Sequence, residues 1–131
     1  MKRGYEKEFD ILLRNSNFDI IKSSLFIRDF SIKEITYEID HLTQRKNILF
    51  VFEGKLHNIE KAKKQLVKKR ESIFYFKLEL LKQGFKEFNE IRLFGYSWHK
   101  KIIIEYDFKG KILNFWKFKD VEELLIVLDN L

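Results

Sequence analysis

The chain contains neither cysteine nor proline among its 131 residues. Without cysteine it has no disulfides, thiol nucleophiles or zinc–thiolate sites, so carboxylates and histidines remain as metal ligands, and any metal is expected to be bound through oxygen. Without proline it lacks one marker of domain boundaries, and no repeat, low-complexity tract or linker divides it. The sequence therefore predicts a single domain over residues 1–131.

Long apolar runs are also missing. No run approaches the roughly 18 to 20 uninterrupted apolar residues that span a bilayer. The first residues, Met1 to Glu6, lack the apolar middle of a secretion signal. A composition that is 45% hydrophobic and 35% charged suits one globular core. These features predict a soluble, cytoplasmic protein with no membrane partner.

The charge balance is positive, with a formal net charge of +6. Such a charge suits a polyanionic partner, which favours nucleic acid. A lysine-rich composition also follows from an AT-rich genome. Charge alone therefore leaves both interpretations open.

Apolar periodicity predicts a mixed α/β domain. The first half is expected to contain a helix over 5–14, a strand over 18–22 closed by Ser23-Ser24, a strand over 34–42, a turn over 44–47 and a buried central strand over 48–52. One long helix from Asn58, or two helices separated near Ser72, should follow, with Gly84 as the C-terminal cap. The remainder is expected to form a strand over 91–96, a hairpin of 101–107 and 111–118 turning at Lys109-Gly110, and a final helix capped by Asp120. Together they predict a central mixed β-sheet flanked by helices, with an added C-terminal hairpin and helix.

Two acids and a lysine follow neighbouring predicted strands: Asp40, Glu53 and Lys55. Phosphodiester hydrolysis needs an activated water, neutralised phosphoryl charge and a stabilised leaving oxygen, and divalent metals held by carboxylates supply all three. Mg²⁺ takes one or two carboxylates, so Asp40, Glu53 and the Gly54 carbonyl are the predicted ligands, with Mn²⁺ expected to substitute. Side chains alternate along a strand, which puts Lys55 on the face of Glu53, where its ammonium would orient water or stabilise the phosphate.

The acid-x-lysine pattern is weak in a chain so rich in both residue types. Asp107-Phe108-Lys109 matches it as well, at the tip of the predicted hairpin. What distinguishes Glu53-Gly54-Lys55 is the apolar strand before it, the helix after it and the second acid on the preceding strand. The competing interpretation is that these are ordinary surface charges at strand ends.

The order of a helical glutamate, a strand aspartate and a strand ending in acid-x-lysine resembles the PD-(D/E)xK nuclease superfamily. The start, with Gly4 before Glu6-Lys7-Glu8, is similar to archaeal Holliday-junction resolvases, and Glu38 to Leu42, with His41 after the aspartate, is similar to the nuclease-related domain. The resemblance covers about residues 3 to 66. Two features depart from it: Ile39 replaces the proline of the superfamily name, and the segment Phe26 to Lys33 places Asp40 farther along than in the resolvases.

The resemblance implies a restriction-endonuclease-like fold and Mg²⁺-dependent cleavage of DNA, as an endonuclease or exonuclease, with junction resolution among the activities. Carried over by position, the catalytic residues are Glu6, Asp40, Glu53 and Lys55, and Glu8 is the alternative to Glu6. Gln65 follows on the next helix, where some relatives carry a glutamine near the site.

Two further groups carry the chemistry of nucleic-acid binding. One is a helical run of cations that includes Lys61, Lys64 and Lys68, and the other interleaves rings with charge over Tyr96, Trp98, Lys100 and Lys101. A solvated helix face and aromatic residues covering the core rim are the plainer interpretations. His41 points away from Asp40, which favours a core or surface role, and His57 and His99 are expected to be exposed.

Two other classes of function remain open. One is a non-catalytic nucleic-acid-binding module that keeps the nuclease fold. The other is an interaction subunit, in which the apolar segment 121–131 docks a partner or a second copy to form a homodimer.

Overall fold

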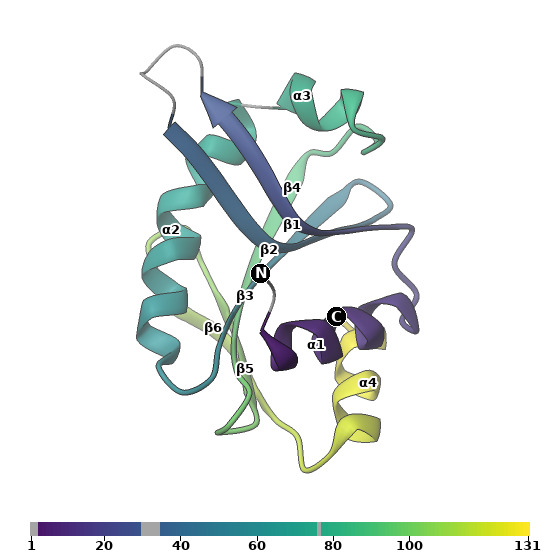
Figure 1. The fold of residues 1–131 in the computed structure, drawn as a ribbon, viewed down its shortest axis with the longest axis vertical. Coiled ribbons are helices and arrows are strands. Elements are labelled where there is room, and N and C mark those ends of the chain that lie inside the picture. Colours follow the sequence, from purple (N-terminus) through teal and green to yellow (C-terminus); the bar gives the residue numbers. More distant parts are fainter. Residues whose placement is uncertain (1–2, 30–34, 76) are drawn as a thin grey trace.

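A computed structural model describes residues 3–29, 35–75 and 77–131. Its elements follow one another in the order α1 (Gly4–Arg14), β1 (Ile20–Asp29), β2 (Ile35–Arg45), β3 (Ile48–Lys55), α2 (Ile59–Tyr75), α3 (Lys77–Lys82), β4 (Glu90–Ser97), β5 (Ile102–Tyr106), β6 (Ile112–Lys117) and α4 (Val121–Asp129) (Figure 1). This is the predicted sequence of elements, with the helical stretch after β3 divided in two.

The strands form one six-stranded sheet in chain order, from β1 at one edge to β6 at the other. All neighbours are antiparallel except β3 and β4, which are parallel and joined through α2 and α3. The sheet is therefore mixed, which confirms the predicted fold class. β3 lies inside the sheet, and its wholly apolar run from Leu49 to Phe52 is buried, because both of its faces are covered.

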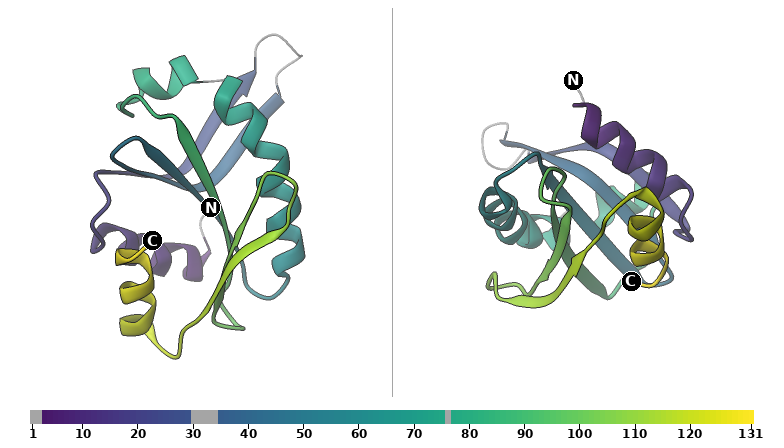
Figure 2. Two further views of the ribbon diagram at one scale, coloured as in Figure 1. Left: turned by 180° about the vertical axis from the view of Figure 1, so that it is seen from behind. Right: turned by 90° about the horizontal axis from the view of Figure 1, so that it is seen from below.

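Helices cover the two faces of the sheet. Viewed along the strands, α2 lies on one side of the sheet and α1 with α4 lies on the other (Figure 2). The core is accordingly split into two clusters, one with Leu49, Val51 and Leu66 under α2, and one with Phe9, Phe52 and Leu124 under α1 and α4. None of the described helices combines the length and apolar character needed to cross a membrane.

Three predicted boundaries were wrong. β1 does not close at Ser23-Ser24 but continues to Asp29, with Ser24 in a left-handed conformation (φ 52°) that the strand absorbs as a local irregularity. The turn before β3 is only Lys46-Asn47, because β2 extends to Arg45. α2 runs through Ser72 to Tyr75, and α3 covers Lys77–Lys82, so no helix boundary lies at Ser72. Residues 30–33 of the segment Phe26 to Lys33, and the first residue of the strand predicted over 34–42, lie outside the described residues.

Two predicted caps are confirmed. The Asp120 carboxylate accepts a hydrogen bond from the Glu123 N–H at 3.0 Å and starts α4. Gly84 has a φ of 103° and ends α3, where the Phe85 N–H donates back to the Leu80 carbonyl.

The edge strand β6 is exposed along its length, including three large apolar side chains, Ile112, Leu113 and Phe115. The β5–β6 turn also exposes Phe108.

Candidate active site

Asp40 lies where β2 and β3 separate. The paired register between these strands ends at His41 opposite Phe52. One residue beyond it, the Asp40 Oδ2 accepts a hydrogen bond from the Gly54 N–H at 3.0 Å. The Asp40 carboxylate thus accepts a hydrogen bond that a strand carbonyl would otherwise accept. This bond holds Asp40, one of the predicted metal ligands, against the backbone of Glu53-Gly54-Lys55.

Glu53 is buried next to Asp40, with 1% of its surface exposed. The pKa of Glu53 is raised to about 8, chiefly by burial and next by the charge of Asp40, while the ammonium of Lys69 acts in the opposite direction. Hydrogen bonding to Asp40 is a further contribution that raises this pKa. The two acids predicted from the sequence therefore converge closely enough to share a proton.

Lys69 completes this arrangement from α2. Its Nζ lies 2.5 Å from the Glu53 Oε1, and its side chain is only 13% exposed. Lys69 belongs to the same helical run of cations as Lys61, Lys64 and Lys68, for which a solvated face or a DNA contact was predicted, and neither prediction holds for this residue. The signal was present in the spacing, because Lys69 falls on the same helical stripe as the buried Ala62, Leu66 and Ile73.

Lys55 is the last residue of β3 and is half-buried. Strand alternation puts it on the face of Glu53. Its ammonium makes no hydrogen bond or ion pair with any residue that the structure describes, so its charge is not used within that part of the protein.

Of the two helical glutamates, Glu6 lies near the site and Glu8 faces solvent. The Glu6 Oε2 accepts a hydrogen bond from the Arg3 N–H at 3.3 Å, which caps α1. The charge of Glu6 also helps to raise the pKa values of Tyr5 and Tyr96. Glu6 does not join Asp40 and Glu53 as a third ligand, since the described residues contain no group of three or more acids, histidines or cysteines suited to a metal.

A buried polar network lies behind the acids, on the α1 face of the sheet. The His41 Nδ1 lies 2.6 Å from the Asp10 Oδ1, its Nε2 lies 2.8 Å from the Tyr96 hydroxyl, and the Ser23 hydroxyl donates to Asp10. Since a carboxylate only accepts, we assign the proton to Nδ1, and in the neutral ring Nε2 accepts from Tyr96. Burial raises the pKa of Tyr96 well above its ordinary value, which keeps this hydroxyl protonated. His41 therefore has the core role that strand alternation favours.

Gly54 links this network to the site. A side-chain carbon at Gly54 would lie 2.0 Å from the Tyr96 ring and 2.2 Å from its hydroxyl oxygen. The tyrosine therefore lies directly against the segment whose N–H binds Asp40. Only glycine leaves room for this contact.

The donor atoms suit a hard cation. Asp40, Glu53 and the Gly54 carbonyl offer oxygen ligands, the small protein share that Mg²⁺ takes alongside water. Gln65 lies one helical turn before Lys69, and helical side chains lean toward the helix N-terminus, so the two share one side of α2. The Gln65 Oε1 is buried and accepts no hydrogen bond from the described residues, which adds a further uncommitted oxygen.

The predicted nucleic-acid contacts divide into exposed and buried residues. Lys61, Lys64 and Lys68 are exposed on α2, Lys100 and Lys101 are exposed after β4, and Trp98 is half-buried. Tyr96 is fully buried, which agrees with the plainer interpretation that aromatic residues here cover the core, and leaves Trp98 as the ring that a ligand can reach. His57 and His99 are exposed as expected, with ring centres 4.6 Å apart.

Comparisons with protein-family models, curated proteins and solved structures gave no match to the chain.

Proposed function

We propose that this protein is a metal-dependent DNA nuclease of the PD-(D/E)xK type, with Mg²⁺ or Mn²⁺ held by Asp40, Glu53 and the Gly54 carbonyl. The observation that carries the proposal is the convergence of Asp40 and Glu53, which lie on the two neighbouring strands β2 and β3. Burying Glu53 beside the half-buried Asp40 costs folding energy, and such an arrangement is typical of a functional site.

Each residue has a distinct task in this proposal. Asp40 and Glu53 supply charged oxygen ligands, and the Gly54 N–H fixes the orientation of Asp40. The bound ion would activate water and neutralise the phosphoryl charge. Lys55 places a free ammonium beside the scissile phosphate, while Lys69 orients the Glu53 carboxylate.

Incubating the purified protein with Mg²⁺ or Mn²⁺ and single-stranded, duplex and branched DNA tests the proposal. We expect cleavage that EDTA stops, and a loss of cleavage of at least about a hundredfold in Asp40→Asn and Glu53→Gln, because each substitution removes a charged ligand. The decisive comparison is Lys55→Met against Lys109→Met. Both lysines follow an acid by two residues, but Lys109 lies in the hairpin turn, and its N–H binds Asp107.

We expect Lys55→Met to abolish cleavage with DNA binding largely intact, and Lys109→Met to cut at the wild-type rate. Equal rates for the two variants would remove Lys55 from the mechanism. Absence of cleavage on every DNA form, together with no heat of Mn²⁺ binding in calorimetry, would overturn the proposal.

The second candidate is a non-catalytic nucleic-acid-binding module. One observation favours it: the Lys69 ammonium is bonded to Glu53 within the acidic pair, where it supplies positive charge without a metal. This candidate predicts DNA binding that is equal with and without metal, and no cleavage.

A further inference from the structure

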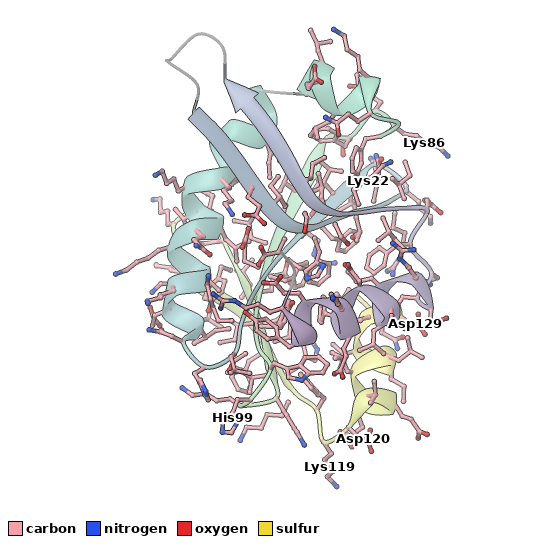
Figure 3. The ribbon with its side chains drawn as sticks, in the orientation of Figure 1. Lys22, Lys86, His99, Lys119, Asp120 and Asp129 are labelled. Atoms are coloured by element: carbon pink, nitrogen blue, oxygen red, sulfur yellow. The ribbon has the colours of Figure 1, made fainter. Side chains whose placement is uncertain are left out.

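A surface hollow of about 280 Å³ lies at the end of the sheet where β4 ends and β6 leads into α4. Its lining residues are Trp98, Lys101, Phe118, Lys119, Asp120 and Val121. We call it the Trp98 hollow. Figure 3 labels Lys119 and Asp120 at this end of the molecule, with His99 at the same end.

The rings of Trp98 and Phe118 form one wall of the Trp98 hollow, and backbone hydrogen bonds fix the position of both residues. The Trp98 and Phe118 rings lie 6.2 Å apart, with 53° between their planes. Backbone hydrogen bonds hold both residues, from the Trp98 N–H to the Lys55 carbonyl at 2.9 Å and from the Phe118 N–H to the Lys101 carbonyl at 3.0 Å. Trp98 remains half-buried and Val121 is 54% exposed, so apolar surface stays open to a ligand.

The rim of the Trp98 hollow is cationic. Lys100, Lys101 and Lys119 are exposed around it. The nearby acids are committed to the protein backbone: Asp120 accepts from the Glu123 N–H at 3.0 Å, and Glu123 accepts from the Lys119 N–H at 2.9 Å. An anionic ligand with an aromatic ring therefore fits both the charge and the wall.

The hollow also lies close to the proposed cleavage site in the fold. Trp98 is hydrogen-bonded to Lys55, which is two residues beyond Glu53 on β3. Two residues of strand span about 7 Å. The Glu53 side chain faces α2, whereas Trp98 packs against the cluster under α1 and α4, so a strand of nucleic acid that reaches both sites would pass around the sheet end at Lys55 and Trp98.

We propose that the Trp98 hollow binds one unpaired base of a DNA strand, which stacks on Trp98 while neighbouring phosphates contact Lys100, Lys101 and Lys119. The choice of DNA rests on the proposed function. The hollow is slightly smaller than the roughly 300 Å³ at which ordinary ligand pockets begin, so it accepts a single ring system. A base inside a duplex is stacked on both sides and does not reach such a site. The substrate class is therefore DNA with unpaired nucleotides beside the cut.

Binding measured in EDTA tests this without interference from cleavage. The probes are a fluorescein-labelled oligothymidylate and a blunt duplex of equal length. Trp98→Phe and Trp98→Leu are a matched pair, because both side chains fill space against Phe118 but only phenylalanine has a ring face. We expect Trp98→Leu to weaken single-strand binding about tenfold, as loss of one base–ring stack does, and Trp98→Phe to stay near the wild-type affinity.

The control is Phe115→Leu, which removes an exposed ring from β6 outside the hollow. It should leave single-strand binding unchanged. Duplex binding should be equal in all three variants, because it depends on charge alone. Wild-type single-strand binding by Trp98→Leu, or an equal loss for single strand and duplex, would overturn the inference.

The two proposals fail separately. Cleavage that depends on Asp40 and Glu53 but not on Trp98 overturns the base site and leaves the nuclease. Single-strand binding that depends on Trp98, in a protein that cuts no DNA, supports the base site and overturns the nuclease.

Discussion

Among single residues, Glu53 has a proton affinity that couples the site to folding. Its pKa is about 8 in the folded protein, against an ordinary value of 4.5. Between these two pH values the folded state keeps a proton that the unfolded chain has lost. Stability should therefore fall as pH rises from about 4.5 to about 8, by an amount on the order of a few kcal/mol, and then level off.

Glu53→Gln removes this proton. We expect its unfolding free energy to change less than that of the wild type across the same pH window, which denaturant titrations at several pH values would measure. Two parallel curves would show that Glu53 ionises normally and that Asp40 is not close to it.

Replacing Lys69 and replacing Lys55 should have different effects on the stability of the protein. Lys69→Met removes the ammonium that contacts the buried Glu53 carboxyl and leaves that carboxyl without its polar partner on α2, so we expect a cost of about 1–3 kcal/mol in thermal unfolding. Lys55→Met removes an ammonium with no partner among the described residues, so the change should stay within about 0.5 kcal/mol. An equal loss in both variants would contradict the assignment of the structural task to Lys69.

Among the elements, the contact between β3 and β4 depends on Gly54. Gly54→Ala places a methyl group within the Tyr96 ring, so Tyr96 or β3 must move, at a cost of about 1–3 kcal/mol. The matched control is Gly4→Ala at the start of α1, where nothing lies within 4 Å of the added carbon. We expect that control to unfold at the wild-type temperature or above it, whereas an undisturbed Gly54→Ala protein would refute the close packing.

Periodicity predicted the helices and strands well, because burial on one face or on both leaves a direct pattern in the sequence. It misplaced the end of β1, since Ser23-Ser24 has the composition of a turn, but Ser23 is paired with His41 and the pairing with β2 resumes at Leu25. It also placed Asp40 and Glu53 together correctly, from their positions at the ends of neighbouring strands. Lys69 was missed because it lies among exposed lysines in the sequence. Its burial becomes visible only once the face of α2 that packs on the sheet is known.

At the scale of the whole molecule, the sheet ends in β6, whose central residues carry no charge that would oppose pairing with another chain. The central residues of β6, Leu113 to Trp116, include no charge, and no further strand from the described residues pairs with its outer edge. Unpaired edges of this kind favour association. We expect oligomers that increase with protein concentration in sedimentation velocity, and Phe115→Lys to suppress them. A wild-type protein that stays monomeric at millimolar concentration would contradict this.

The ends of β6 modify that tendency. When two copies align in opposite directions with Asn114 facing itself, Lys111 of each copy lies opposite Lys117 of the other. These lysines then act as gatekeepers through mutual repulsion, which acts over about 10 Å in 0.1 M salt and only about 3 Å in 1 M salt. Concentrated salt, often added to keep basic proteins in solution, should therefore promote aggregation of this protein through β6.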